Sequence, residues 1–307
     1  MTRSAERSVA ERRWAPTGPL DLLRTLAPLR RGGGDPTFRV ADGAVWLTMS
    51  TPAGAATLRL STQDDTVLGR AWGAGAEVVL AGLPDLLGAA DDPSGFRPAH
   101  PLLVSVLRHH PGVRIGRTRR VFEQVVPAVL EQKVTGVESR RSWRELLLRF
   151  GGPAPGPAPA GMRVMPTPAD WLALPDWEWH LAGVDLPRRR AIRAAASVAG
   201  RLEECVMLTP QAASRRLQAV PGVGPWTAAE VAQRALGDAD AVSVGDYHIP
   251  ALVGWALVGE PLDDAGMLTL LEEYRPHRHR VVRLVELSGL RPPRRGPRAT
   301  IRDFRRL

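Results

Sequence analysis

The residues best suited to chemistry lie in one stretch, Leu217–Ile249, where Asp246 stands just before an apolar run. A carboxylate held in place can stabilise positive charge that develops during a reaction, and it can orient or deprotonate an attacking water. Asp246 could instead only cap the helix that we expect to run on through Ile249, since aspartate is common at helix starts. The two roles are compatible, because a capping carboxylate is rigidly held. We therefore predict Asp246 as the catalytic residue.

A glycine-rich hairpin precedes Asp246, with the sequence Pro221-Gly222-Val223-Gly224. We expect a second helix to begin right after it, at a proline whose missing N–H costs nothing in the first helical turn. Both glycines can take positive φ, so the pattern predicts a tight turn between two helices. The free backbone N–H groups at the start of the second helix would point outward, which suits a phosphate.

The composition bounds the class of protein and of partner. The 307 residues are enough for two or more domains, and 44% hydrophobic with 24% charged residues is typical of a globular chain. A net charge of +9 indicates a polyanionic partner. However, Lys133 is the only lysine, and an arginine-rich composition is also typical of a GC-rich genome. Charge alone therefore leaves the partner open.

Cysteine and histidine usage argues against metal and redox chemistry. Cys205 is the single cysteine, which excludes a disulfide within the chain and a four-cysteine iron–sulfur cluster. The histidines show no metal-binding spacing, so we predict no metal site. No apolar run approaches the length of a membrane span, and the first residues lack the apolar core of a signal peptide. We therefore expect a cytoplasmic protein.

Two regions of different periodicity predict the domain organisation. Between residues 37 and 60 apolar residues recur in steps of two, which predicts a small antiparallel sheet with covering helices. Val67–Ala71 could add a strand or begin a helix. After this domain nearly all segments have helical spacing. The expected parts are a frayed N-terminus (1–13), an α+β domain (14–95), a helical region (96–289) containing a Pro/Ala/Gly linker without a core (151–161), and a disordered basic tail (290–307).

The hairpin, the Trp226-Thr227-Ala228 that follows it, and Asp246 twenty positions beyond Trp226 together resemble the helix-hairpin-helix DNA glycosylases. Within them the pattern is most similar to bacterial 3-methyladenine DNA glycosylase II. The resemblance implies a mostly α fold, in which the helix-hairpin-helix core is preceded by a small α+β antiparallel-sheet domain. It also implies that the partner is double-stranded DNA with a damaged base, and that the protein acts as a monomer at the nucleoid.

In that family the hairpin binds the DNA backbone, and the aspartate lies beside the sugar of a flipped nucleotide. Breaking the glycosidic bond develops positive charge on the deoxyribose, so the resemblance carries the catalytic role to Asp246. Members that also nick the strand have a lysine at the position of Trp226, whose amine forms a Schiff base with the sugar. The resemblance therefore implies a monofunctional glycosylase, without abasic-site lyase activity, that hydrolyses alkylated purines from DNA in base excision repair.

The resemblance also assigns residues to the base pocket. Trp226 and Tyr247 would line it, because an electron-rich ring favours a cationic alkylated purine; Trp226 could instead pack between the hairpin helices. Glu230 and Glu286 stand where the family has aromatic pocket residues, and would bind a cationic or amino-bearing base or else face solvent. Gln132, in the stretch that opens the family's helical domain, is assigned to the pocket as well.

The remaining assignments concern contacts with DNA. In related enzymes the residue after this glutamine fills the gap left by the flipped base; an apolar wedge is usual there, and this chain has Lys133, which could instead be a solvent-facing lysine. Arginines on the first turns of a helix do not suit its dipole, so they indicate phosphate contact as an alternative to a solvated face. The DNA-binding residues predicted here are Pro221, Gly222, Val223, Gly224, Thr227, Lys133, Arg188, Arg189 and Arg190.

A second interpretation is a non-enzymatic DNA-damage binding protein that keeps the same scaffold. Asp246 favours the enzyme, whereas the altered wedge and pocket favour the binding protein. Neither interpretation requires a cofactor, and the one ion that the resemblance allows is a monovalent cation at the hairpin.

Overall fold

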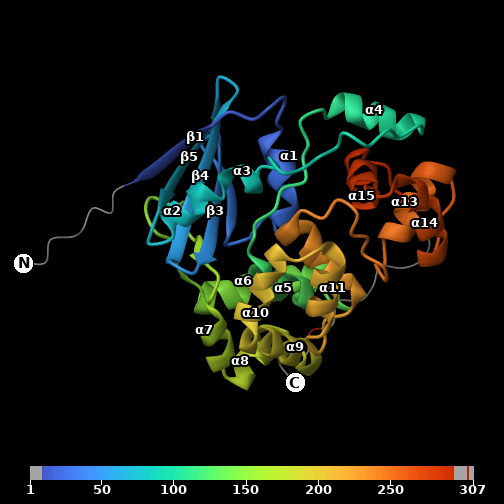
Figure 1. The fold of residues 1–307 in the computed structure, drawn as a ribbon. Coiled ribbons are helices and arrows are strands. Elements are labelled where there is room, and N and C mark those ends of the chain that lie inside the picture. The colour runs from blue at the N-terminus through green and yellow to red at the C-terminus, as the bar shows by residue number, and fades with distance from the viewer. Residues whose placement is uncertain (1–8, 294–302, 304–307) are drawn as a thin grey trace, which may run out of the picture.

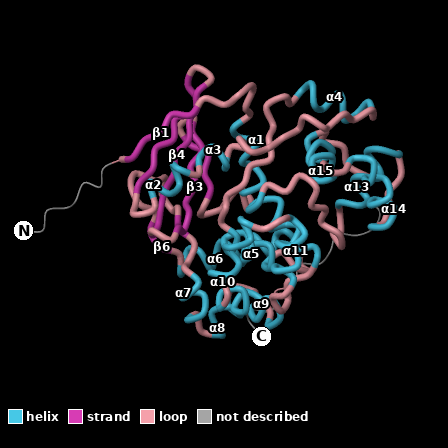
Figure 2. Tube along the Cα trace, in the orientation of Figure 1, coloured by secondary structure: helices cyan, strands magenta, loops and turns pink. Residues whose placement is uncertain are grey.

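The computed structural model of the chain describes residues 9–293 and residue 303. Figure 1 shows a sheet on one side of the molecule and two groups of helices, one below the sheet and one across from it. In Figure 2 the strands of the large sheet stand together, and most helices lie outside this part. Within the described residues no helix is both long and apolar enough to cross a membrane.

Five antiparallel strands form the N-terminal sheet in the order β1-β5-β4-β3-β2. Alternation along β3 turns Val45, Leu47 and Met49 toward the core beneath the sheet. Val67–Ala71, which could be a strand or the start of a helix by sequence, lies in a strand. The strands are β1 (Ala10–Trp14), β2 (Phe38–Ala41), β3 (Ala44–Thr51), β4 (Gly54–Gln63) and β5 (Thr66–Trp72).

The start of the chain differs from the prediction. Residues up to Arg13 are predicted to be frayed, but this is wrong for residues 10–13, which belong to β1 and pair with β5. The ladder places Ala10 opposite Ala71 and Trp14 opposite Val67. A short, largely polar segment carries little strand signal by itself, and it is the unpaired edge of β5 that orders it. Residues 1–8 lie outside the described part of the chain.

Short helices cover the inner face of the sheet. The first helix is short, because Pro28 lies in a 3₁₀ turn that follows it directly. Leu80 and Leu83 join the apolar core under the sheet. These elements are α1 (Leu22–Leu26), η1 (Ala27–Leu29), α2 (Ala76–Ala81) and α3 (Leu83–Leu86).

The Pro/Ala/Gly segment 151–161 is not a free linker, so that prediction is wrong. It runs between the short strands β6 (Gly152–Pro153) and β7 (Arg163–Val164) and packs on the outer face of the sheet. There Trp46 and Trp72 stack with ring centroids 5.7 Å apart. At Gly156 a Cβ would lie only 2.3 Å from a ring carbon of Trp72, so glycine permits this close approach. Trp46 and Trp72, on the outer face of the sheet, supply the apolar surface that the segment itself lacks.

The first helical group has its core around α5, whose helical neighbours include α9, α10 and α12. Its elements are α5 (Val121–Leu130), α6 (Gly136–Phe150), α7 (Pro168–Ala173), α8 (Asp176–Leu181), α9 (Leu186–Ser197), α10 (Ala199–Glu203), η2 (Glu204–Met207), α11 (Pro210–Gln218), α12 (Pro225–Val231) and η3 (Ala232–Leu236).

The second helical group has a separate apolar core that includes Phe96, Leu103 and Val281. The chain enters it with α4, leaves for the first group, and returns after residue 241. Its elements are α4 (Pro101–His109), α13 (Ile249–Val258), α14 (Asp264–Leu271), η4 (Glu272–Tyr274) and α15 (Arg278–Leu287). The basic tail predicted for residues 290–307 lies mostly outside the described residues.

One carboxyl group lies at the junction of the sheet domain and α5. The side chain of Glu123 accepts a hydrogen bond from the backbone N of Ser50 at 2.5 Å. Burial raises the pKa of Glu123 to about 8, although the bond from Ser50 and the charge of Arg120 oppose the shift. The carboxyl group is therefore mostly protonated in the folded protein at neutral pH.

This raised pKa predicts a pH-dependent stability. Because Glu123 binds its proton more tightly when folded, its stabilising contribution is complete below the unfolded pKa near 4.5 and is lost as pH rises toward 8. The shift sets an upper limit of about 5 kcal/mol on this loss. We expect urea unfolding of Glu123→Gln, which keeps the acceptor oxygen, to show a smaller loss of stability between pH 5 and 8 than the parent. The exposed Glu77→Gln is the control, and equal pH dependence in parent and Glu123→Gln would contradict the assignment.

Candidate DNA-binding and base-excision site

The predicted hairpin joins α11 to α12. Gly222 has a φ of +86°, whereas Gly224 is extended, so the prediction of positive φ holds for Gly222 alone. A Cβ at Gly222 would also lie 2.6 Å from the Cβ of Ala191 on α9, so packing requires glycine there as well. Val223 is buried, and its N–H donates to the carbonyl of Val220 at 3.0 Å. The turn is therefore fixed from inside the protein.

Gly224 differs from Gly222, because nothing inside the protein requires it to be glycine. It is the N-cap residue of α12, and a Cβ built there would meet no atom within 4 Å. The first backbone N–H groups of α12 follow directly, beginning after Pro225. Open space in front of free N–H groups is what an approaching phosphate needs. Phosphate contact at Pro221, Gly222 and Gly224 stays a prediction.

Two residues predicted to touch DNA or the base hold the hairpin in place. The side chain of Thr227 is buried, and its Oγ1 accepts a hydrogen bond from Nε2 of Gln132 at 2.8 Å. The same Nε2 donates to the carbonyl of Gly222 at 2.9 Å. The side chain of Thr227 is therefore not available to DNA, whereas a pocket role for Gln132 stays a prediction. Gln132, beyond the end of α5, braces the hairpin against the core helix.

Asp246 lies against the first turn of α12, and both of its carboxylate oxygens are held. Oδ1 accepts hydrogen bonds from the backbone N of His248 at 2.7 Å and of Ile249 at 2.9 Å, which caps the start of α13. Oδ2 accepts from Nε1 of Trp226 at 2.9 Å. The carboxylate is partly exposed. The structure thus brings together the two residues that the sequence separates by twenty positions, and it fixes the orientation of the carboxylate.

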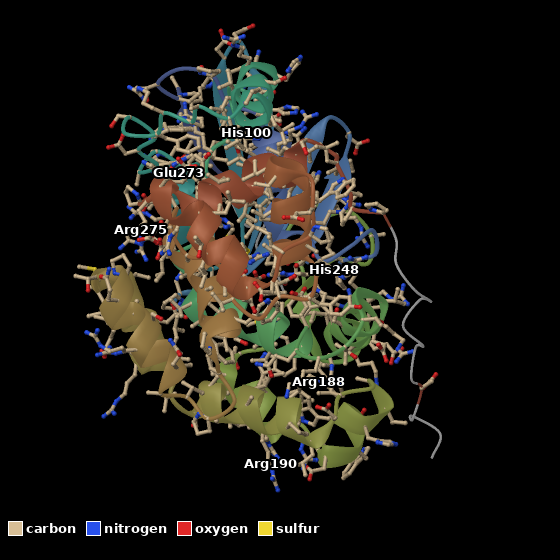
Figure 3. The ribbon with its side chains drawn as sticks, turned by 90° about the vertical axis from the view of Figure 1, so that its right-hand side faces the viewer. His100, Arg188, Arg190, His248, Glu273 and Arg275 are labelled. Carbon is tan, nitrogen blue, oxygen red and sulfur yellow. The ribbon has the colours of Figure 1, made fainter. Side chains whose placement is uncertain are left out.

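The two aromatic residues predicted to line the base pocket lie near Asp246, and neither is among the described residues that line the cavity next to it. The partly buried indole of Trp226 is directed at Asp246. Tyr247 is 90% exposed, and its ring meets only the edge of His248, with centroids 4.9 Å apart. Figure 3 shows His248 on the side of the molecule that faces the viewer. Trp226 therefore orients the carboxylate and Tyr247 is available on the surface, and a contact of either ring with a base stays a prediction.

A cavity of about 280 Å³ lies where the sheet domain, the first helical group and α15 meet. Ser243 and Ile249, on either side of the Asp246 loop, line it. Glu230 and Glu286, both predicted for the base pocket, also line it. The cavity is thus adjacent to the loop that carries the candidate catalytic carboxylate.

Comparisons with known proteins agree with this geometry. No protein-family model matches the chain. A curated Mycobacterium tuberculosis protein, "Probable bifunctional transcriptional activator/DNA repair enzyme AlkA", is 35% identical over 155 residues, which is 49% of this chain and 30% of the relative. The match thus spans about a third of the length of that relative.

Solved structures match over most of the chain. The 3-methyladenine DNA glycosylase of Archaeoglobus fulgidus superposes with a TM-score of 0.74 at 17% identity, covering 90% of this chain and 98% of that one. The 8-oxoguanine glycosylase/lyase of Clostridium acetobutylicum superposes with a TM-score of 0.70 at 12% identity, covering 91% and 98%. The chain has the helix-hairpin-helix DNA glycosylase fold. The predicted resemblance and the predicted fold class, mostly α with a small α+β N-terminal domain, are confirmed.

Within the helix-hairpin-helix glycosylase fold, Lys133 lies in the turn between α5 and α6. It is exposed and has a φ of +53°, which is uncommon for a residue with a side chain. Because Gln132 is tied to the hairpin, the turn that carries Lys133 is anchored next to it. This position is compatible with the wedge role, which stays a prediction.

The three arginines at the start of α9 lie in three different environments. Arg188 is buried, and its guanidinium donates to the carbonyls of Leu130 at 3.0 Å and Gly183 at 3.1 Å. The prediction that Arg188 contacts DNA is therefore wrong, because buried carbonyl groups already take its donors. Arg189 pairs with Asp176 at 2.7 Å. Arg190 is exposed and extends outward from the molecule in Figure 3, so it alone of the three presents an exposed guanidinium.

The cavity also contains residues that sequence analysis missed. Arg234 pairs with Glu230 at 2.8 Å, and Arg31 pairs with Glu131 at 3.2 Å. The spacing of Glu230 and Arg234, four residues apart on one helix, could have indicated the first pair. Arg31 and the cavity-lining His279 carry no comparable signal, because tertiary packing alone brings them here.

Proposed function

We propose that this protein is a monofunctional DNA glycosylase that removes a damaged purine from double-stranded DNA by hydrolysis, in base excision repair. Alkylated purines are the first class to test, because the resemblance points to them and a structural neighbour is named for 3-methyladenine. The observation that carries the proposal is the position of Asp246, whose two oxygens are held by Trp226 and by the start of α13 next to the cavity.

In the proposed reaction the bond between the base and the anomeric carbon breaks, and its electron pair leaves with the base. The sugar then carries positive charge, which a fixed carboxylate stabilises without having to reorganise. Water adds to the anomeric carbon and gives up a proton, so that the products are a free base and an abasic site. Because the hydrogen bonds from His248, Ile249 and Trp226 fix Asp246, the carboxylate keeps its position as the charge develops. No electron is transferred, so this reaction needs no redox cofactor.

The DNA would lie across the hairpin. Gly224 and the first N–H groups of α12 offer a phosphate site. Arg190 and Lys133, in the same helical group, are exposed cations. The net charge of +9 favours a polyanion in general. We propose that the protein acts as a monomer on chromosomal DNA in the cytoplasm, and a monovalent cation at the hairpin stays a prediction.

The experiment that tests the proposal is release of free base from DNA. We expect the protein to release a modified purine from duplexes that each carry a single lesion, among them 3-methyladenine, 7-methylguanine and hypoxanthine, as measured by chromatography. An undamaged duplex is the control. If the protein binds these duplexes more tightly than undamaged DNA but releases no base, it is a damage-binding protein instead. That second candidate is favoured by one observation: no aromatic ring is found among the described residues that line the cavity.

The product should be intact abasic DNA. Lyase chemistry requires an amine at the anomeric carbon, and the hairpin presents Trp226 there; Lys133 is the only lysine in the chain. We expect no strand cleavage until alkali is added, and no covalent adduct on borohydride treatment. An adduct that disappears in Lys133→Ala would show that Lys133 is a nucleophile and that the enzyme is bifunctional. An adduct that persists would point to the N-terminal amine and would equally overturn the monofunctional assignment.

A further inference from the structure

The cavity beside Asp246 is lined by charged side chains, and most of them form ion pairs with one another. Each of its three glutamates pairs with an arginine: Glu230 with Arg234, Glu131 with Arg31, and Glu286 with Arg283. Five arginines and three glutamates line the cavity, so the excess formal charge is positive. A cationic base that entered would therefore gain no net attraction from this lining.

Cation recognition by aromatic rings is also missing here. A ring face attracts a cation within about 6 Å of its centroid. The described residues that line the cavity include no Trp, Tyr or Phe. Trp226 is directed at Asp246, and Tyr247 lies on the surface. The two physical means of selecting a cationic purine, stacking and net negative charge, are therefore both absent from the described lining.

His279 is a cavity residue whose hydrogen-bonding capacity is left open. It lies on the first turn of α15, is only 8% exposed and lines the cavity. Neither ring nitrogen has a hydrogen-bond partner in the part of the chain that the structure describes. Because His279 lines the cavity, a ligand there can supply the hydrogen-bond partner that the protein does not.

The environment of His279 also determines its charge. Burial, followed by the nearby cations Arg283, Arg234 and Arg280, holds the pKa of the imidazole well below its ordinary value. The ring is therefore neutral at physiological pH, with one nitrogen that donates and one that accepts. Further along the same helix, the cavity-lining Glu286 uses Oε2 for Arg283, which leaves its other oxygen as an acceptor.

We infer that this cavity selects a neutral damaged purine with an N–H group next to a C=O group, and that His279 is the residue that determines this specificity. The carbonyl oxygen of such a base accepts a hydrogen bond from the N–H of His279 or from a cavity guanidinium. The N–H of the base donates to a glutamate oxygen. Hypoxanthine and 8-oxoguanine both present this edge without a positive charge. Undamaged guanine presents it too, so the cavity contacts select the neutral edge, and the lower cost of flipping a damaged or mispaired base selects the lesion. The inference rests on the proposed glycosylase function and names the substrate class of that same site.

The test compares duplexes that carry hypoxanthine, 8-oxoguanine or 7-methylguanine, the last of which has the same edge as 8-oxoguanine but a positive charge. We expect single-turnover excision of at least one neutral base to exceed that of 7-methylguanine, each after subtraction of spontaneous loss. His279→Ala should slow excision of the neutral base about tenfold or more, the scale of one lost hydrogen bond in a desolvated site. His279→Gln, which keeps a donor and an acceptor, should recover part of the rate.

Two further variants separate specificity from structure. His279→Phe replaces hydrogen bonding with an aromatic face, so the ratio of 7-methylguanine to neutral-base excision should rise; a merely structural role would lower both equally. His277→Gln is the control, because His277 is also buried at the start of α15 but packs on Phe96 outside the cavity. Thermal unfolding verifies that each variant folds.

The possible outcomes are distinguishable. Excision of a neutral base that falls in His279→Ala and is rescued in His279→Gln supports the inference. Excision of 7-methylguanine alone, or rates that do not respond to His279→Ala, would overturn the inference while leaving the proposed glycosylase intact. Release of no base from any duplex would overturn both.

Discussion

Asp246→Asn should lower the rate of base excision by roughly 10²-fold or more, the scale of a lost catalytic carboxylate. The substitution removes the negative charge that would stabilise the sugar cation. It retains a carbonyl oxygen to accept from the backbone N of His248 and Ile249, and asparagine is as good a helix cap as aspartate. The new amide nitrogen would face the indole N–H of Trp226, so that hydrogen bond is lost. Single-turnover rates with saturating protein measure the effect on the chemical step.

Binding and folding provide the controls for this substitution. We expect the affinity for lesion-bearing DNA to persist, because Asp246 is not predicted to contact phosphate. Asp263→Asn makes the same chemical change at another helix cap, where the carboxylate accepts from Gly266 N at 2.8 Å at the start of α14, and it should leave excision unchanged. An excision rate in Asp246→Asn equal to that of the parent would remove Asp246 from the mechanism.

Gly224→Asp should weaken DNA binding about tenfold or more, whether or not the DNA is damaged. The open space in front of Gly224 accepts a side chain without a clash, so the fold should be kept. A carboxylate in that space would repel an approaching phosphate, and the repulsion decreases as salt screens it. Affinity measured at matched and at rising salt concentrations distinguishes this effect from a change in the fold.

Gly200→Asp is the matched control for the hairpin. Gly200 is an exposed glycine in α10 where a Cβ also meets open space, and its substitution adds the same charge away from the hairpin. It should change affinity far less than Gly224→Asp does. Equal affinities of the two variants would show that DNA does not touch the hairpin.

Local patterns were sufficient to predict the elements that carry the site. The alternation in β3 and β4, the proline at the start of α12 and the glycines of the hairpin all act within a few residues, so they can be read along the chain. Asp246 was predictable for the same reason, since it caps the helix that directly follows it. The family pattern added what spacing alone does not show, which is that hairpin and carboxylate belong to one site.

The roles of individual polar side chains depended on tertiary structure. The sequence predicts Arg188 as an exposed cation at the start of a helix. In the structure its guanidinium donates to the carbonyl of Leu130, 58 positions away. Gln132 reaches Thr227, 95 positions away, and braces the hairpin, which its sequence neighbours do not indicate. A long polar side chain has donors that can face solvent or a buried carbonyl, and its sequence neighbours do not decide between them.

The chemistry of the cavity is the clearest case. The sequence alone placed Glu230 and Glu286 near the base, but not the arginines that neutralise the cavity or the neutral His279 beside them. Arg31 meets Glu131 across 100 positions of sequence, because the sheet domain packs against the end of α5. The charge and the hydrogen-bonding capacity of a cavity are properties of the groups that surround it in space. The sequence by itself therefore determined the elements and indicated the class of the site, and only the tertiary structure decided which charges and hydrogen-bonding groups line its cavity.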